Sequence, residues 1–152
     1  MSILNMIDDI PMVKHFSEKD KEAFAKLDHS VQGFNNGDII IKEGNAYTCL
    51  YLLIRGSISI IKTGYSTPLA TLKAGSIFGE VSFLTKKPRK NNVIAVDNVL
   101  ILKMDQSFFD KLPHEINDKI KNYLIELLGE RLDAMNKALD KIARFAGISG
   151  LP

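Results

Sequence analysis

The spacing of hydrophobic residues changes twice along the chain. Within residues 17–27, apolar positions recur at helical spacing behind Ser17, which is suited to cap a helix, and Asp20, which can complete a capping box. Short β-branched runs separated by Gly, Asn, Asp and Pro occupy residues 30–104, and helical spacing returns from Asp105 onwards. This order predicts a mainly β domain with flanking helices.

The β-rich region is typical of a β-sandwich or β-roll. Its predicted strands end at turns that contain glycine, which tolerates the positive φ angles that tight turns require. The alternation within residues 57–60 predicts a strand with its serines in water and its isoleucines inside. The predicted strands are residues 39–41, 49–54, 57–62, 93–96 and 99–103, and the turn glycines are Gly37, Gly44, Gly56 and Gly64.

A long final helix is predicted from Pro113, which suits a first helical turn, to about Phe145. At about 1.5 Å per residue, a helix of roughly thirty residues is about 45 Å long, more than so small a domain can cover. We expect its apolar stripe to pack on a partner helix, most simply that of a second copy; the alternative is a helix lying back on its own sandwich. The stripe comprises Ile125, Leu128, Leu132, Met135, Leu139, Ile142 and Ala146, and the opposite, wet face is expected to carry Glu126, Arg131, Asp133 and Lys137.

Composition favours one domain. With 152 residues, of which 45% are hydrophobic, the chain can bury one core, and we assign residues 1–146 to it, including the C-terminal helix (about 114–146), and residues 147–152 to a tail. The net charge of +2 is small and spread out, which does not favour nucleic acid or an anionic membrane. A single cysteine, the lack of a long apolar run and two early aspartates where a signal peptide would be apolar predict a cytoplasmic protein.

Motifs for metal binding and catalysis are not evident. His15, His29 and His114 lie far apart, and no predicted strand carries a histidine, so a metal-binding β-roll is not expected. The chain has neither a Gly-x-Ser-x-Gly turn nor a triphosphate-binding loop, and Cys49 has no base beside it in sequence. We therefore expect a protein that is not an enzyme and has no metal or cofactor.

The segment from Gly79 to Arg89 carries the residues needed to bind a small sugar phosphate. Glycine lets the backbone approach a ligand, the apolar residues after it can form one helical turn, and backbone amides and a forked guanidinium both favour a phosphate. An ionised carboxylate only accepts hydrogen bonds, so Glu80 would accept one from a sugar hydroxyl. The alternative is a solvated basic loop made of Lys86, Lys87, Arg89 and Lys90.

This segment, Phe-Gly-Glu-Val-Ser-Phe-Leu followed after three residues by Pro-Arg, resembles the phosphate-binding cassette of cyclic nucleotide-binding domains, such as those of the cAMP receptor protein and protein kinase A regulatory subunits. The similarity covers about residues 12–139. It implies a double-stranded β-helix, a jelly-roll-like β-roll, with an N-terminal helix and a long C-terminal helix. By resemblance, Glu80 would hold the ribose 2′-hydroxyl, Arg89 would pair with the cyclic phosphate, and Gly79, Val81 and Ser82 would add contacts.

The resemblance also implies the ligand and the output. A cyclic nucleotide is expected, cAMP in the first place with cGMP as the alternative, and the C-terminal helix would move on binding. Leu132 and Met135 on that helix are candidates to cover the base. Regulators similar to this domain add a helix-turn-helix module after the long helix, and none follows here, so we expect a partner protein or a homodimer and no direct contact with nucleic acid or membrane.

Three residues depart from the family pattern. Lys90 and Asn91, which we also count among the candidate ligand-binding residues, stand at the phosphate mouth, where small residues usually follow the arginine. Lys86 stands where a loop glycine is common. They favour a competing interpretation, a degenerate domain that no longer binds nucleotide and acts in protein–protein interaction or dimerisation. Within the helix, Gly129 costs on the order of 1 kcal/mol relative to Ala. It permits close helix contact, marks a flexible joint or is a tolerated surface glycine.

Overall fold

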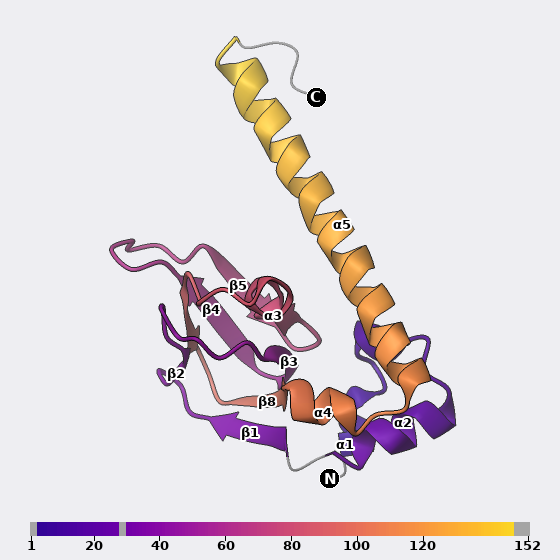
Figure 1. Cartoon of the computed structure of the whole chain (residues 1–152). Coiled ribbons are helices and arrows are strands. Elements are labelled where there is room, and N and C mark those ends of the chain that lie inside the picture. The colour runs from indigo at the N-terminus through magenta and orange to yellow at the C-terminus, as the bar shows by residue number, and fades with distance from the viewer. Residues whose placement is uncertain (1–2, 28–29, 148–152) are drawn as a thin grey trace.

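The computed structural model describes residues 3–27 and 30–147 and contains two four-stranded antiparallel sheets that pack face to face. One sheet has the strand order β1-β8-β3-β6 and the other the order β2-β7-β4-β5. Figure 1 shows these two layers, with α1, α2, α4 and the start of α5 gathered at one end and α3 beside the strands. The strands are β1 (Val31–Phe34), β2 (Ile39–Ile41), β3 (Leu50–Arg55), β4 (Ser57–Ile61), β5 (Ala70–Lys73), β6 (Ile77–Phe78), β7 (Asn92–Ala95) and β8 (Val99–Met104). The predicted mainly β fold is confirmed.

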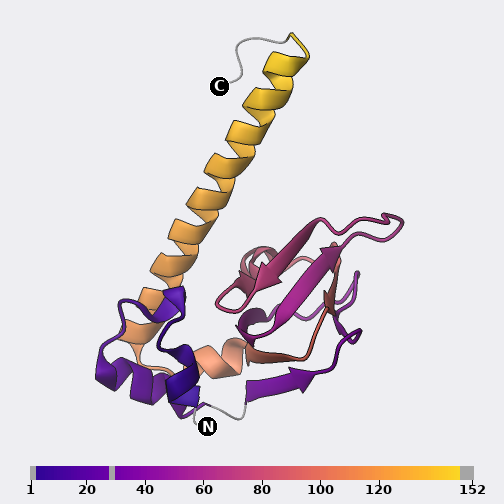
Figure 2. The ribbon, with the colours of Figure 1, turned by 180° about the vertical axis from the view of Figure 1, so that it is seen from behind.

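The helices lie before, within and after the β-roll. Figure 2 shows from behind how the N-terminal helices surround the start of the long last helix, whose far end projects away from the rest of the molecule. This projection excludes the alternative in which the whole helix lies on its own sandwich. The helices are α1 (Ile3–Ile7), the 3-10 helix η1 (Pro11–Val13), α2 (Glu18–Ala25), α3 (Glu80–Thr85), α4 (Gln106–Asp110) and α5 (His114–Phe145).

Strand β3 lies between two hydrophobic cores and contributes to both. Its alternate residues Leu50 and Leu52 point into a core shared with the helices, and Tyr51 and Leu53 point into the core between the sheets. Because both of its faces are buried, the strand reads as an unbroken apolar run. The helical core takes up the first half of α5 through Ile116, Ile120 and Leu124.

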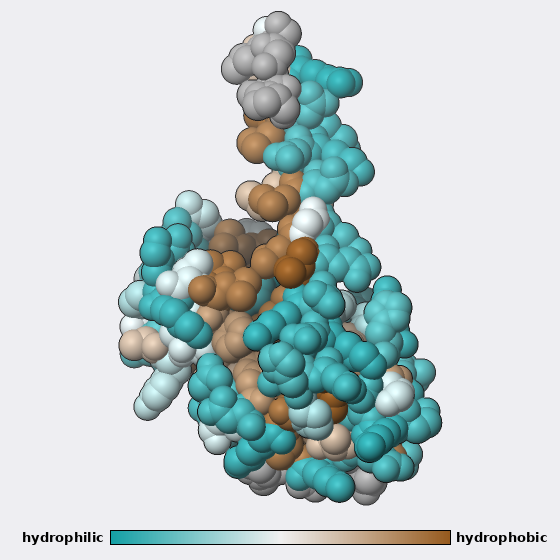
Figure 3. Space-filling view, turned by 45° about the vertical axis from the view of Figure 1, so that its right-hand side comes forward, coloured by the Kyte–Doolittle hydropathy of each residue, from teal (hydrophilic) through white to brown (hydrophobic). Residues whose placement is uncertain are grey.

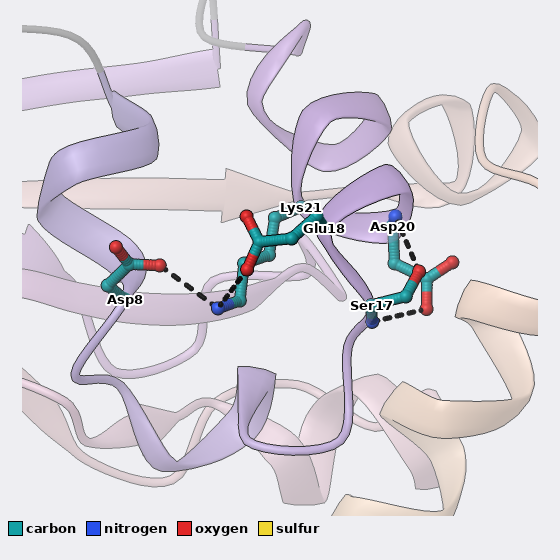
Figure 4. A network of polar contacts seen from close by, with 5 residues as sticks. All are labelled: Asp8, Ser17, Glu18, Asp20 and Lys21. Carbon is teal, nitrogen blue, oxygen red and sulfur yellow. Dashed lines mark hydrogen bonds and ion pairs between the residues drawn. The ribbon is translucent and has the colours of Figure 1, made fainter.

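The start of α2 is fixed by polar contacts that the sequence predicted. Ser17 Oγ accepts a hydrogen bond from the Asp20 amide at 3.1 Å, and Asp20 Oδ2 accepts one from the Ser17 amide at 3.0 Å, which is a capping box. Figure 4 shows how the same helix is tied to the preceding segment, because Lys21 Nζ lies 3.1 Å from Asp8. Lys21 Nζ also lies 3.5 Å from Glu18 within the helix. Asp20 also pairs with Lys119 of α5 at 2.5 Å, joining the two ends of the fold.

Several elements and one orientation differ from the sequence prediction. The prediction omitted α1, η1, β1, β5 and β6, which are short or, in β5, largely exposed, so that they carry little hydrophobic pattern. Ser59 was expected in water but is only 5% exposed, with its Oγ 3.4 Å from Thr71 Oγ1 of β5. The four turn glycines do adopt positive φ, from 85° at Gly44 to 91° at Gly37. The predicted tail, 147–152, lies outside the described residues except for Gly147.

The Asp20 contacts make stability depend on pH. The hydrogen bond from Lys119, followed by the Ser17 amide, holds the pKa of Asp20 below its ordinary value. A carboxyl group with a lowered folded-state pKa adds stability above its unfolded pKa, about 3.9, and loses it as the pH falls through the folded value. We expect Asp20→Asn to reduce the free energy of unfolding by about 1 to 2 kcal/mol at pH 7. Urea unfolding measured from pH 7 to pH 2 should show this difference shrinking below about pH 4.

The control for this prediction is Asp9→Asn, which changes an exposed carboxylate between α1 and η1. It should leave the unfolding midpoint nearly unchanged at every pH. A difference between wild type and Asp20→Asn that stays constant down to pH 2 would contradict the ionic role of Asp20.

Candidate functional site

A cavity of about 440 Å³ lies between α3, the second sheet and α5. Its mouth and one side come from the segment 77–91, its far wall comes from β2, β4, β5 and β7, and one side chain reaches it from α5. The lining residues are Ile41, Ile60, Ala70, Leu72, Ile77, Phe78, Gly79, Glu80, Val81, Ser82, Thr85, Lys87, Pro88, Arg89, Lys90, Asn91, Val93 and Arg131.

Gly79 is where the chain turns from β6 into α3. Its φ of 81° is left-handed, a conformation that favours glycine. A Cβ at this position would lie 2.7 Å from Arg89 Nη1 and 3.1 Å from both the Cys49 carbonyl oxygen and Tyr51 Cδ2. Glycine is therefore required both by the backbone and by the close approach of the arginine.

Arg89 is held by backbone carbonyls and is only 6% exposed. Its Nη1 donates to the Gly79 carbonyl at 2.7 Å and its Nη2 to the Cys49 carbonyl at 2.5 Å. The backbone of Arg89 pairs with the turn at residues 42–45. Its amide donates to the Asn45 carbonyl at 3.0 Å, and its carbonyl accepts from the Gly44 amide at 2.8 Å. The guanidinium is thus hydrogen-bonded to the backbone at both Nη atoms before any ligand contact is considered.

The charge of Arg89 has no partner carboxylate among residues 3–27 and 30–147. Burial lowers the pKa of Arg89, an effect that the neighbouring Tyr51 and Cys49 oppose. A guanidinium has five N–H donors, so three remain after the two carbonyl bonds. A buried cation with free donors and no counterion is suited to bind an anion.

Glu80 lies at the other side of the site and is paired with α5. Arg131 donates from Nη1 to the Glu80 carboxylate and from Nη2 to the Ile77 carbonyl at 3.1 Å. Glu80 is buried, and burial lowers the pKa of Arg131. The sequence prediction that Arg131 faces water is therefore wrong, because its guanidinium reaches back from the helix to the cassette.

The rest of the cavity divides into an apolar wall and a basic mouth. Ile60 and Leu72 belong to a wall of side chains from the second sheet, which offers a flat group little but apolar contact. At the mouth, Lys87 and Lys90 are exposed and Asn91 is half-buried. This arrangement suits a ligand with one anionic end and one apolar end.

The structure brings most of the predicted site residues together. The cavity is lined by Gly79, Glu80, Val81, Ser82, Arg89, Lys90 and Asn91. Leu132 and Met135 do not line it and are each 60% exposed on α5, so their role over the base stays a prediction. Sequence reasoning missed the inward role of Arg131 and the strand residues of the wall, because their positions depend on contacts between segments far apart in the chain.

The described residues offer neither a metal-binding cluster nor a membrane-spanning helix. Within 3–27 and 30–147, the His, Cys, Asp and Glu side chains do not form a group of three or more that could hold a metal ion. In the same part of the chain, no helix has both the length and the apolar character needed to cross a membrane.

Comparisons with known proteins agree with this geometry. The sequence profile described as "Cyclic nucleotide-binding domain" matches residues 31–115. A cAMP-dependent protein kinase regulatory subunit of Aspergillus niger is 26% identical over 112 residues, which cover 74% of this chain and 27% of that protein. The chain therefore spans about a quarter of the length of this relative.

Solved structures show the same fold. The catabolite activator protein of Thermus thermophilus has a TM-score of 0.72 at 23% identity, over 88% of this chain and 63% of that chain. The regulatory domain of Toxoplasma gondii PKA, crystallised with cAMP, has a TM-score of 0.62 at 19% identity, over 81% and 48%. The profile match runs from β1 to the start of α5, more than half of the sequence, and includes the whole cassette. The chain belongs to the cyclic nucleotide-binding domain family.

Proposed function

We propose that the protein binds a cyclic nucleotide, cAMP in the first place, and reports its binding through α5. The observation that carries this proposal is the buried Arg89 guanidinium, which shares a cavity with Glu80 and pairs with no carboxylate of the described residues. A cyclic phosphate is a monoanion that would match this charge. Its ribose supplies a 2′-hydroxyl donor for the carboxylate.

In the proposed complex each part of the ligand has one kind of neighbour. The phosphate lies between Arg89 and the backbone of residues 79–82, and the 2′-hydroxyl donates to Glu80. The base lies along the apolar wall that includes Ile60 and Leu72. The name of the Aspergillus relative, a cAMP-dependent regulatory subunit, supports cAMP over cGMP.

Arg89→Ala should weaken cAMP binding by about a hundredfold or more, because it removes a charge-assisted, bidentate contact worth roughly 3 kcal/mol. Isothermal titration calorimetry with cAMP measures the change. Lys90→Ala is the matched control, since Lys90 lines the same cavity but is exposed. It should cost no more than about fivefold.

Two outcomes would count against this assignment. Equal affinity of wild type and Arg89→Ala would show that the phosphate lies elsewhere. Failure of cAMP and cGMP to raise the melting temperature, when a ligand at a hundred times its Kd adds about 2.7 kcal/mol, would favour the second candidate function. That candidate is an interaction domain that binds no nucleotide, and Lys90 and Asn91 at the mouth are the residues that support it.

The proposed signal passes from the cassette to the last helices through two contacts. Arg131 of α5 is bonded to Glu80 at the start of α3. Phe83 of α3 packs on Phe109 of α4, with ring centroids 5.3 Å apart. A ribose hydroxyl that donates to Glu80 alters the first contact, and any inward shift of α3 alters the second. The ligand can bias helix position only by its differential affinity for the two arrangements, commonly about 1 to 3 kcal/mol.

Binding of cAMP should change the distance between the roll and the far end of α5. Spin labels at Lys73 and Lys141, both exposed, placed in a Cys49→Ser background, would report this distance by pulsed electron paramagnetic resonance. We expect Arg131→Ala to reduce the cAMP-induced shift while leaving most of the affinity from Arg89. Lys137→Ala is the matched control, because Lys137 contacts Asp133 of the same helix at 3.0 Å. An unchanged distance distribution in wild type would contradict helix movement.

The projecting part of α5 is the proposed site of self-association. Figure 3 shows apolar surface along one side of this segment and hydrophilic side chains along the other. The nearby charges are already paired within the helix, Lys137 with Asp133 and Arg144 with Asp140. A second copy of the same stripe would cover it without leaving unpaired charge. On α5, the exposed large apolar residues are Ile125 (69%), Leu132 (60%), Met135 (60%), Leu139 (52%), Ile142 (64%) and Phe145 (97%).

Leu139→Glu should convert the proposed homodimer to monomer, because each copy would then bury a charge in the apolar surface between the two helices. Light scattering coupled to size-exclusion chromatography measures the mass across a concentration series. Lys137→Ala again serves as control and should remain dimeric. A wild-type monomer at every concentration would contradict self-association and leave the stripe to a partner protein.

A further inference from the structure

An aromatic pair lies beneath the Arg89 guanidinium. The Cζ atom of Arg89 is 5.5 Å from the centre of the Tyr51 ring, within the range of a cation–π interaction. On its other side, Tyr51 stacks on Phe78, with ring centroids 5.2 Å apart and an angle of 10° between the planes. Tyr51 is 8% exposed and Phe78 1% exposed, so neither ring can turn away freely.

The backbone explains why Tyr51 lies at this place. In β3, Tyr51 points into the core between the sheets, and it pairs with Phe78 of β6 in the sheet register. Cys49, just before the strand, supplies one of the two carbonyls that hold Arg89, and Gly79, just after β6, supplies the other. The two neighbouring strands therefore position both the ring, which lies in β3, and the carbonyls, which flank β3 and β6.

The two carbonyl bonds alone do not fix the orientation of the guanidinium. Each Nη donates one hydrogen bond, and whenever these two bonds open, rotation about the Nε–Cζ bond would turn the remaining N–H groups away from the cavity. A cation held over a buried ring loses part of this freedom, because turning the guanidinium would weaken its contact with the ring. The ring thus supplies the constraint that the hydrogen bonds leave open.

We propose that Tyr51 is a positioning residue for phosphate recognition, acting through its ring on the orientation of Arg89. This proposal rests on the proposed function for its ligand but makes a claim about Arg89 that can be measured without one. A residue that merely fills the core would change stability and all ligand contacts together. A positioning residue changes the mobility of the arginine and the phosphate-dependent part of binding.

Three variants separate these roles. Tyr51→Phe keeps the ring and removes the hydroxyl, which also interacts with Arg89. Tyr51→Leu removes both and keeps an apolar core residue. Phe24→Leu is the matched stability control, because Phe24 is fully buried among aromatic rings of the other core, away from the cavity. Each variant is first checked by its melting temperature, and the Arg89 comparisons are made only well below it.

The first measurement needs no nucleotide. Nitrogen-15 NMR of the Arg89 guanidinium reports the rate of rotation about its Nε–Cζ bond. We expect Tyr51→Leu to speed this rotation about tenfold, and Tyr51→Phe and Phe24→Leu to leave it within about threefold of wild type. Equal rotation rates in wild type and Tyr51→Leu would overturn the proposal, whether or not the protein binds cyclic nucleotides.

The second measurement is the affinity for cAMP by calorimetry. Tyr51→Leu should weaken it about tenfold, and Tyr51→Phe should restore it to within about threefold of wild type. In an Arg89→Lys background, which retains the charge but not the planar fork, Tyr51→Leu should add little further loss. Full additivity of the two losses, or an equal loss in Phe24→Leu, would assign Tyr51 a structural role only. Lack of cAMP binding by wild type would instead refute the proposed function and leave the NMR result to decide the role of Tyr51.

Discussion

The burial of one guanidinium without a carboxylate is the constraint on which the site depends. Two backbone carbonyls place partial negative charge next to Arg89 but are not a counterion. The cation therefore remains uncompensated within the described part of the chain. The two carbonyls flank β3 and β6, which pair with each other in the first sheet. The sheet therefore fixes the position of the positive charge, and the segment 79–89 only has to carry the side chain to it.

Arg131 keeps the two charges of the cavity apart. Glu80 and Arg89 line the same cavity, and a direct ion pair between them would neutralise both and close the site on itself. Instead Glu80 bonds to Arg131, which comes from α5 and is also held by the Ile77 carbonyl. The carboxylate is thus satisfied by a residue of α5, the helix that we propose as the output of the domain. Under this proposal, a ligand that engages Glu80 would act on that helix.

The features predictable from the sequence were those that depend on neighbouring residues. The capping box at Ser17, the positive φ of the turn glycines and the turn at Gly79 follow from local chemistry, and the structure confirms them. The direction of Arg131 did not follow, since its partner lies 51 residues away and heptad spacing alone placed it in water. The predicted exposure of Ser59 was wrong for the same reason, because β5, which covers this residue, has too little hydrophobic pattern to be predicted. Local pattern located the cassette, and only packing between distant segments showed what surrounds it.

Helix α5 carries a buried segment, the Arg131 contact to the cassette and the exposed apolar stripe on one continuous rod. Its first half is buried in the core through residues such as Ile120. The exposed stripe begins at Ile125, and Arg131 reaches the cassette from a position next to Leu132 of that stripe. The helix is continuous through Gly129, so in the proposed mechanism a change at Arg131 would reach the stripe as movement of a rod. If the stripe pairs two copies, nucleotide binding and self-association are linked equilibria, and by reciprocity each must alter the other by the same free energy. Affinity for cyclic nucleotide would then depend on protein concentration, which a rigid domain with a separate dimer interface would not require.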